Sequence, residues 1–380
     1  MKQEEDMSAI IKDKKYVTYD EKPVCAADYE AATDSLKRTP TLAIVMQGPL
    51  RLEENFTRET LKIYQKNFPD CPIVLSTWKT ENADEIKKIE DLGVKVLLNT
   101  PPLCKGLGNV NKQILSTQNG LAYAKETGAE YVIKTRTDQR FYETNIPEFL
   151  FNILKSFPVY NCGTQKSRLV TLSMNTFKYR LYDISDMFLF GHIDEVIKFW
   201  SCSFEQRTEF PPYKNLLEYA KLRPSEIYFT TEYLKKLCHD CKYTLRDSWL
   251  AYGRYFCVID SVSVGLYWPK YSNIVNRWRN FFGAFPELEE LTFKEWLNIY
   301  AGLDNKNVPE HFITDGFPQK SGLFFNENLF GGSAFGILKI LKRIRKFIFY
   351  KKENAKGFLI VKVLGVRIIK LKKRKKNEAD

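Results

Sequence analysis

The sequence lacks a long hydrophobic run. No stretch reaches the roughly 18 to 20 uninterrupted apolar residues that a membrane-spanning helix requires. The first residues, Met1 to Tyr16, are mostly polar and charged, whereas a secretory signal peptide contains an apolar segment near its start. These absences favour a protein that stays in the cytoplasm and does not cross the membrane.

Histidine is scarce and cysteine is scattered. The three histidines, His192, His239 and His311, lie far apart in the sequence, which does not favour catalysis by any of them. The eight cysteines show no disulfide-like pattern, and the CxxC pair Cys238 and Cys241 has no second pair near it. The sequence also contains no GxSxG elbow, Walker loop or GxGxxG fingerprint, so it does not support the enzyme classes that these motifs mark.

The excess of positive charge lies almost entirely at the end of the chain. The formal net charge is +12, but residues 339–380 contain 16 Lys and Arg against three acidic residues, which gives +13. The remaining 338 residues therefore sum to −1. A neutral body does not favour nucleic acid as a partner.

The basic segment has the pattern of an amphipathic helix. Residues 335–349 can place four apolar side chains on one face: Leu338, Leu341, Ile344 and Ile348. Five cations crowd the remainder: Lys339, Lys342, Arg343, Arg345 and Lys346. Such a helix binds a membrane surface through apolar burial and anionic lipid. We expect residues 331–380 to form a membrane-associating tail, with strand, turn and strand after Gly357. A solvated tail, or a helix packed on the body, is the alternative.

The first part of the chain alternates between short apolar runs and helical patterns. Apolar runs predict strands at 42–46, 72–78, 94–98 and 131–138, with helices at 54–67, 81–91 and 109–127 between them. This spacing predicts βαβ units, and therefore an α/β fold whose mostly parallel sheet has helices on both faces.

After residue 145 the pattern becomes α+β. Strands are expected at 168–174, at 186–190 and within 250–268, and helices near 193–201, 213–221 and 225–238 and from Pro286 to about Leu303. We divide the chain into an N-terminal extension at 1–40, a main domain at 41–330 with halves at 41–145 and 146–330, and the tail at 331–380.

Three polar clusters stand where predicted strands end. They are Gln47-Gly48-Pro49, Ser76-Thr77-Trp78 and Arg136-Thr137-Asp138. The carboxyl ends of parallel strands share one edge of a sheet, and ligands of such sheets bind at that edge. Gly48 has no Cβ and would let the backbone approach a base or ribose. This edge is the predicted binding site, although each cluster alone could be an ordinary turn.

Asp138 is the first candidate for chemistry. A carboxylate at the end of a core strand can hold Mn²⁺ or Mg²⁺ that bridges the phosphates of a nucleotide, or it can be a turn or cap residue. Lys134 and Arg136 precede it, and a guanidinium can pair with phosphate. Asn109 and Asn111 frame the start of the third predicted helix, as ligand contacts or as helix caps.

Two acids in the second half are candidates for a general base. Asp186 directly precedes an apolar strand. Glu226 lies in the first turn of a predicted helix, where the helix dipole also favours a carboxylate. Either residue could take a proton from an attacking hydroxyl, and either could be structural.

Together these motifs resemble the WavE lipopolysaccharide synthesis family. The resemblance rests on the three strand-end clusters, the last extended back to Lys134, and on the segment NVNKQILSTQNGL that begins at Asn109. It runs from about Thr41 to Leu303 and is strongest over 42–140. It implies a GT-A glycosyltransferase fold, in which the first half binds a nucleotide-sugar donor. The Asp186-to-Gly191 segment and Glu226 are similar, more loosely, to the acceptor half of GT-A enzymes.

One position departs from the GT-A pattern. Such enzymes usually carry Asp-x-Asp at the end of the strand that holds the metal, whereas this chain has Arg136-Thr137-Asp138. The divalent cation that the resemblance implies would have Asp138 alone from this motif. Arg136 could replace part of the charge of the cation, or the donor could be a nucleoside monophosphate sugar.

The sequence therefore predicts a glycosyltransferase of bacterial lipopolysaccharide or capsule synthesis, with a saccharide or lipid-linked acceptor. The tail would hold the enzyme on the cytoplasmic face of the inner membrane. No nucleic-acid partner is expected. The alternatives are a nucleotidyltransferase or phosphotransferase on the same kind of sheet, and a non-enzymatic protein whose tail binds polyanions.

Overall fold

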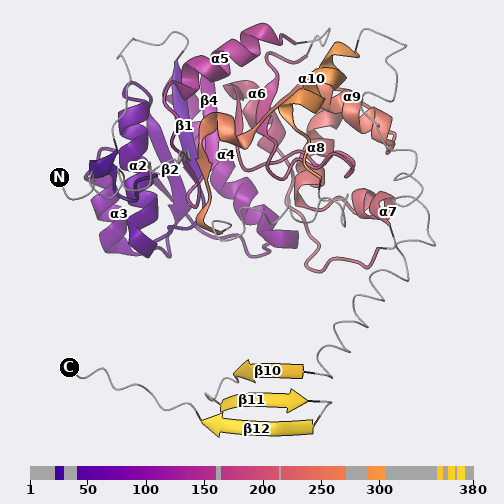
Figure 1. The fold of residues 1–380 in the computed structure, drawn as a ribbon. Coiled ribbons are helices and arrows are strands. Elements are labelled where there is room, and N and C mark those ends of the chain that lie inside the picture. Colours follow the sequence, from indigo (N-terminus) through magenta and orange to yellow (C-terminus); the bar gives the residue numbers. More distant parts are fainter. Residues whose placement is uncertain are drawn as a thin grey trace, which may run out of the picture.

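The centre of the fold is a seven-stranded sheet in the order β3-β2-β1-β4-β7-β6-β8 (Figure 1). The computed structural model describes residues 22–29, 41–159, 164–213, 215–270 and 289–303, and the backbone of 349–353, 358–363 and 366–372. The strands are Leu42–Gln47 (β1), Ile73–Trp78 (β2), Lys95–Asn99 (β3), Tyr131–Arg136 (β4), Leu169–Leu172 (β6), Leu189–His192 (β7) and Phe256–Ile259 (β8). Within this sheet β7 is antiparallel to both of its neighbours, and the other pairs are parallel. The predicted α/β class with a mostly parallel sheet is confirmed.

Helices cover both faces of the sheet, as expected (Figure 1). One face carries Val110–Glu126 (α4) and Ile193–Trp200 (α6), with Ser225–Lys236 (α8) packed on α6. The other carries Phe56–Asn67 (α2), Ala83–Glu90 (α3) and Ile146–Ser156 (α5). Strand side chains alternate between the two faces. On β4, the Lys134 ammonium lies over the Trp200 ring of α6, while the ring of Tyr131 contacts Phe151 of α5.

The remaining elements lie around this sheet. Leu216–Lys221 (α7) precedes α8, and Leu245–Tyr255 (α9) packs against Phe293–Ala301 (α10) next to β8. Arg140–Phe141 (β5) pairs antiparallel with Leu266–Tyr267 (β9). Single 3₁₀ turns are formed by Ala26–Asp28 (η2), Glu53–Asn55 (η3), Leu107–Asn109 (η4) and Ser261–Val264 (η5).

Two parts of the second half differ from the sequence prediction. Strands were expected within 250–268, and β8 and β9 lie there, but residues 250–255 belong to helix α9. Thr244 caps that helix by accepting a hydrogen bond from the backbone N–H of Asp247, and Leu245, Trp249 and Tyr252 are buried one helical turn apart. Their aromatic character imitates a strand, because aromatic residues are also common in strands. Helix α5 was not predicted, although its Pro within the first turn is a regular helix-start signal.

The described part of the predicted N-terminal extension packs against the domain. The backbone N–H of Ala26 donates to the Glu59 carboxylate of α2 at 2.7 Å. The Tyr29 hydroxyl donates to the Asn67 side chain at 2.9 Å. Arg140 donates to the carbonyl of Val24 at 3.1 Å. Residues 22–29 therefore cover the outer side of α2 and β5.

The described backbone of the tail forms a small antiparallel sheet. Its strands are Phe349–Glu353 (β10), Phe358–Val363 (β11) and Val366–Lys372 (β12), with β11 in the centre (Figure 1). Strands β11 and β12 correspond to the two strands expected after Gly357. The predicted amphipathic helix lies outside the described residues, except for Phe349, which begins β10. Of the helices that the structure describes, none is long and apolar enough to cross a membrane.

Gly120 allows α4 to lie close to β1 and β2. A Cβ at this position would lie 2.5 Å from Cγ1 of Val45 and 3.4 Å from Cβ of Ser76. Without a Cβ the helix backbone can approach these strands. This contact sets the depth at which α4 lies above the strand ends.

We expect Gly120→Ala to lower the free energy of unfolding by about 1–2 kcal/mol. At an open helix position the same change would stabilise by about 1 kcal/mol through helix propensity, but overpacking of a core contact costs about 1–3 kcal/mol. Chemical denaturation measures the difference. Ala122→Gly, on the exposed side of the same helix, is the control for propensity alone. Stabilisation by Gly120→Ala would contradict the close contact.

Candidate functional site

The three polar strand ends lie side by side at the carboxyl edge of the sheet. The N–H of Gly48 donates to the carbonyl of Ser76 at 3.2 Å, and the N–H of Thr137 donates to the carbonyl of Gln47 at 3.1 Å. The Thr137 hydroxyl donates to the carbonyl of Pro49 at 2.6 Å. The clusters therefore meet as the sequence predicted, and binding of a nucleotide by them stays a prediction.

Gly48 is required by this junction. Its φ is +125°, a conformation that other residues rarely adopt. A Cβ on Gly48 would lie 2.8 Å from the Thr137 hydroxyl oxygen. The glycine thus allows the end of β1 to contact the end of β4, in addition to any approach by a ligand.

Several residues that were predicted to contact the nucleotide-sugar donor are buried and hydrogen-bonded inside the protein. The Ser116 hydroxyl of α4 donates to Oε1 of Gln47 at 2.9 Å. The Asn99 carboxamide donates to the Ser76 hydroxyl at 2.9 Å and to the carbonyl of Thr77 at 2.7 Å. These residues are at most a few per cent exposed. They therefore support the edge of the sheet from inside the protein.

The two predicted asparagines have different environments. Asn111 is buried, and its carboxamide both donates to and accepts from the backbone of Glu205 at 2.7 Å. Asn109 is exposed at the N-cap of α4 with a left-handed φ of 64°, and its side chain makes no capping bond. Trp78 is buried, and the Lys112 ammonium lies 5.9 Å from its ring centre.

Arg136 and Asp138 form the accessible charged part of the edge. Nε and Nη2 of Arg136 donate to the two carboxylate oxygens of Asp138 at 2.8 and 3.0 Å. The Trp268 indole also donates to Asp138 at 3.0 Å, and the Arg136 guanidinium lies 5.6 Å from that ring. The two charged side chains are 25% and 23% exposed. Burial opposes ionisation of Asp138, but the bond from Arg136 holds its pKa below the ordinary value.

A divalent cation does not fit this arrangement. Both oxygens of Asp138 are engaged by a guanidinium and an indole, whereas Mn²⁺ or Mg²⁺ needs several oxygen ligands. Across the described ranges, no group of three or more acidic, histidine or cysteine side chains is placed to hold a metal.

Lys134 lies inside the protein beneath this edge. Its ammonium donates to the carbonyl of Asp186 at 2.6 Å and lies 4.3 Å from the centre of the Trp200 ring. The side chain has no exposed surface. Burial lowers its pKa to about 7. Lys134 therefore joins β4 to the segment before β7 in this structure.

A cluster of acids lies beside the strand ends. Asp183 and Asp186 come from the segment before β7, and Glu226 comes from the first turn of α8. Burial, followed by the carboxylates of Asp186 and Asp183, raises the pKa of Glu226 to about 8. Burial likewise raises the pKa of Asp183 to about 6, against the effect of Arg180. Oδ2 of Asp186 is buried with no hydrogen-bond partner among the described residues. The structure thus brings together the two acids that the sequence proposed separately.

Three residues of this region were not predicted from the sequence. Asp183 adjoins the predicted Asp186 and could have been found by asking which acids share that segment. Arg180 pairs with Asp183 at 3.6 Å, and Trp268 contacts Asp138 across 130 positions of sequence. Neither Arg180 nor Trp268 stands in a recognisable motif, so the sequence alone does not identify them.

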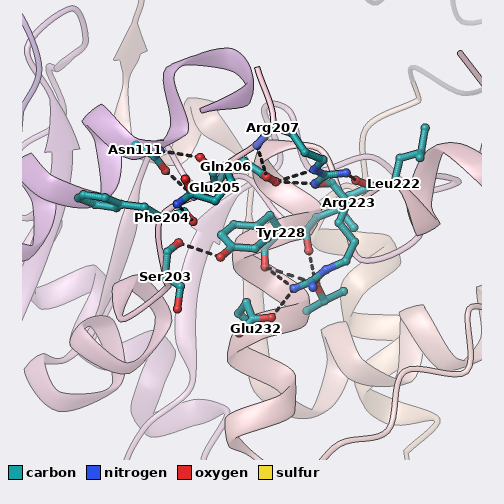
Figure 2. Close-up of polar contacts among 12 residues, drawn as sticks. Asn111, Ser203, Phe204, Glu205, Gln206, Arg207, Leu222, Arg223, Tyr228 and Glu232 are labelled. Atoms are coloured by element: carbon teal, nitrogen blue, oxygen red, sulfur yellow. Dashed lines mark hydrogen bonds and ion pairs between the residues drawn. The ribbon is translucent and has the colours of Figure 1, made fainter. Parts of the chain in front are cut away.

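A polar network fixes the start of α8, which carries Glu226 (Figure 2). Arg223, in the turn between α7 and α8, pairs with Glu232 at 2.6 Å. Arg207 pairs with Glu205 and donates to the carbonyl of Leu222 at 2.6 Å. Because Asn111 holds the backbone of Glu205, this network links the start of α8 to the start of α4. Glu226 and the strand ends are therefore fixed relative to one another.

Comparison with solved structures finds distant likenesses. One is Staphylococcus aureus TarS, at 12% identity over 85% of this chain and 58% of that chain, with a TM-score of 0.36. Another is a nucleoside-diphosphate-sugar pyrophosphorylase from Vibrio cholerae RC9, at 8% identity over 62% of this chain and all of that chain, with a TM-score of 0.34. Likenesses of this size do not identify an activity. No curated protein sequence matches this chain.

A family model gives the identification. The model described as WavE lipopolysaccharide synthesis matches residues 42–249. This range begins at β1 and contains all three strand ends, the acid cluster and the start of α8. It covers more than half of the chain. The protein belongs to the WavE lipopolysaccharide synthesis family.

Proposed function

We propose that this protein is a GT-A-type glycosyltransferase that moves a sugar from a nucleotide-sugar donor to a saccharide or lipid-linked acceptor of surface polysaccharide synthesis. The observation that supports this best is the position of Arg136. Its pKa is raised, against burial, by Asp138 and by the more distant carboxylates of Asp186 and Glu226. The partly exposed guanidinium of Arg136 at the strand ends therefore lies near carboxyl groups that can gain or lose a proton.

Arg136 would hold the donor phosphate. Its Nε and Nη2 bind Asp138, which fixes the plane of the guanidinium and leaves Nη1 for a phosphate oxygen. Charge-assisted bonds from a fixed guanidinium suit phosphate recognition. As the bond from the anomeric carbon to the phosphate oxygen breaks, its electron pair stays on the nucleotide, and Arg136 stabilises the added charge.

The pair of Asp186 and Glu226 would take the proton of the acceptor. The acceptor hydroxyl oxygen forms the new bond to the anomeric carbon, and its proton passes to a carboxylate of the pair. Burial, followed by the carboxylates of Asp186 and Asp183, raises the pKa of Glu226 to about 8, so Glu226 can accept a proton once it has lost its own. General bases act best when their pKa lies near the working pH.

The tail would place the enzyme on the cytoplasmic face of the inner membrane, where it acts as a peripheral protein. The support is the net charge of +13 over residues 339–380, since each basic residue near an anionic surface contributes about 1 kcal/mol. Membrane-bound acceptors would then be within reach of the site.

The first test is binding of nucleotide sugars. We expect UDP-, GDP-, dTDP- or CMP-sugars to raise the melting temperature in the presence of EDTA, because Arg136 supplies the charge. Arg136→Gln should weaken the binding of the stabilising donor by about 10- to 100-fold, since hydrogen bonds to charged groups contribute about 1.5–3 kcal/mol. Calorimetric titration in EDTA measures the affinity.

Arg58→Gln is the matched control for that test. Arg58 of α2 forms a similar partly buried ion pair, with Glu85 at 3.2 Å, on the face of the sheet that carries α2 and α3. Its change should leave the donor affinity as it is. A strict requirement for Mn²⁺, or an unchanged affinity in Arg136→Gln, would contradict the assigned role.

The second test is the pH dependence of sugar transfer. The carboxyl groups of Asp186 and Asp183 and the guanidinium of Arg180 act on Glu226, and Glu226 in turn acts on Arg136. With a pKa of about 8, Glu226 is protonated at neutral pH, and transfer should increase as the pH rises through that value. Asp183→Asn removes one anion and leaves Arg180 without its pairing carboxylate. Both changes lower the pKa of Glu226, so the acidic limb of log(kcat/KM) should move to lower pH by about one unit.

Asp194→Asn is the control for the pH profile. Asp194 of α6 is paired with Lys125 and Lys166, and it is absent from the charges that act on Glu226. Its change should leave the limb in place. A limb that stays fixed in Asp183→Asn, or that moves to higher pH, would exclude Glu226 as the group being titrated.

The third test concerns the membrane. We expect the full-length chain to sediment with phosphatidylglycerol-rich vesicles and not with phosphatidylcholine vesicles. Binding should fall between about 0.1 M and 1 M salt, because the Debye length shortens from about 10 to 3 Å. Replacing Lys342 and Arg343 by glutamate should reduce it, whereas the same change at Lys87 and Lys88 of α3 should not. Equal binding to both kinds of vesicle would contradict electrostatic docking.

A further inference from the structure

Three aromatic side chains form a partly exposed cluster beside the acids. Phe210 and Tyr213 lie between α6 and α7, and Tyr219 lies in α7. The Tyr219 ring centre is 5.0 Å from that of Tyr213 and 5.7 Å from that of Phe210, and the last two are 5.8 Å apart. Phe210 is 38% exposed and Tyr213 44%. Large apolar side chains that are exposed together, rather than singly, mark a binding surface.

Arg180 connects this aromatic cluster to the acids. Its guanidinium lies 5.3 Å from the Tyr219 ring centre and 3.6 Å from the Asp183 carboxylate. Nε of Arg180 is buried without a hydrogen-bond partner among the described residues. The carboxylates of Asp183 and Glu226 both act on the Tyr219 phenol. The aromatic cluster therefore lies close to the proposed base.

The segment that carries the aromatic cluster is fixed at both ends (Figure 2). At its start, Asn111 of α4 binds the backbone of Glu205. Arg207 then pairs with Glu205 and donates to the carbonyl of Leu222, just after α7. Just before Glu205, the carbonyl of Ser203 accepts a hydrogen bond from the Tyr228 hydroxyl at 2.8 Å. A surface held in this way loses little conformational freedom when a ligand binds.

We propose that Phe210, Tyr213 and Tyr219 bind a pyranose ring of the saccharide acceptor. This inference rests on the proposed glycosyl transfer and names the acceptor side of that site. A pyranose presents a C–H face that packs on aromatic rings, as apolar ligands do, and a rim of hydroxyls. The Arg180 side chain is 20% exposed, so its guanidinium offers a donor for one hydroxyl, and Glu226 offers an acceptor for another. The donor phosphate would bind Arg136 at the strand ends. The aromatic cluster would then be available to bind the acceptor.

The test is binding of oligosaccharides to the full-length chain. The probe is the core oligosaccharide mixture released from lipopolysaccharide by mild acid, and saturation-transfer NMR and calorimetry measure its affinity. Tyr213→Ala and Phe210→Ala should each raise Kd by about 10-fold, the scale of a single well-packed aromatic contact. Tyr213→Phe keeps the ring and should retain the affinity. Nucleotide-sugar affinity should be unchanged in all three variants.

Phe204→Ala is the matched control, because Phe204 is 41% exposed on the same segment. The inference is overturned if wild type binds no oligosaccharide, if Tyr213→Ala binds as wild type does, or if Phe204→Ala loses as much. A concentration-dependent dimer that Tyr213→Ala abolishes would also overturn it, since a second copy would be the occupant. Failure of the proposed function has a different signature: the chain then binds no nucleotide sugar in any variant.

Discussion

The parallel pairing of β1 with both β2 and β4 is the constraint on which the rest of the site depends. It aligns Gln47 with Ser76 on one side and with Arg136 on the other, so polar residues far apart in sequence end at one edge. Gly48 permits the contact with Thr137, and Gly120 lets α4 lie close above the same strands. A shift of β1 by one residue would move each of its side chains to the opposite face of the sheet.

Several ionisable groups at this edge are buried, and their neighbours offset only part of the cost of burying their charge. Burial opposes ionisation of Lys134, Asp183 and Glu226 alike, and it moves the pKa of all three toward the physiological range. Arg136 and Asp138 differ, because their bidentate bond keeps both charged and partly exposed. One side of the site therefore offers a fixed cation, and the other offers acids that can exchange a proton. Such shifted groups are typical of functional sites.

The sequence predicts the first half of the fold well, because apolar runs and helix patterns there alternate without ambiguity. Its strand ends could be named before the structure, since parallel strands share their carboxyl edge. The sequence cannot show that the polar groups of Gln47, Ser76 and Asn111 form hydrogen bonds inside the protein. Nor can it show the contact of Trp268 with Asp138, which depends on tertiary packing. Residues 250–255 were misread because aromatic residues suit both strands and buried helices.

Product analysis tests the central claim most directly. The full-length chain would be incubated with nucleotide sugars and the core oligosaccharide mixture, and the released phosphates would be separated by chromatography. Glycosyl transfer predicts a free nucleotide in equal amount to the sugar gained by the oligosaccharide, without pyrophosphate. Release of pyrophosphate, or its consumption with formation of a nucleoside triphosphate, would contradict the account and identify a nucleotidyltransferase.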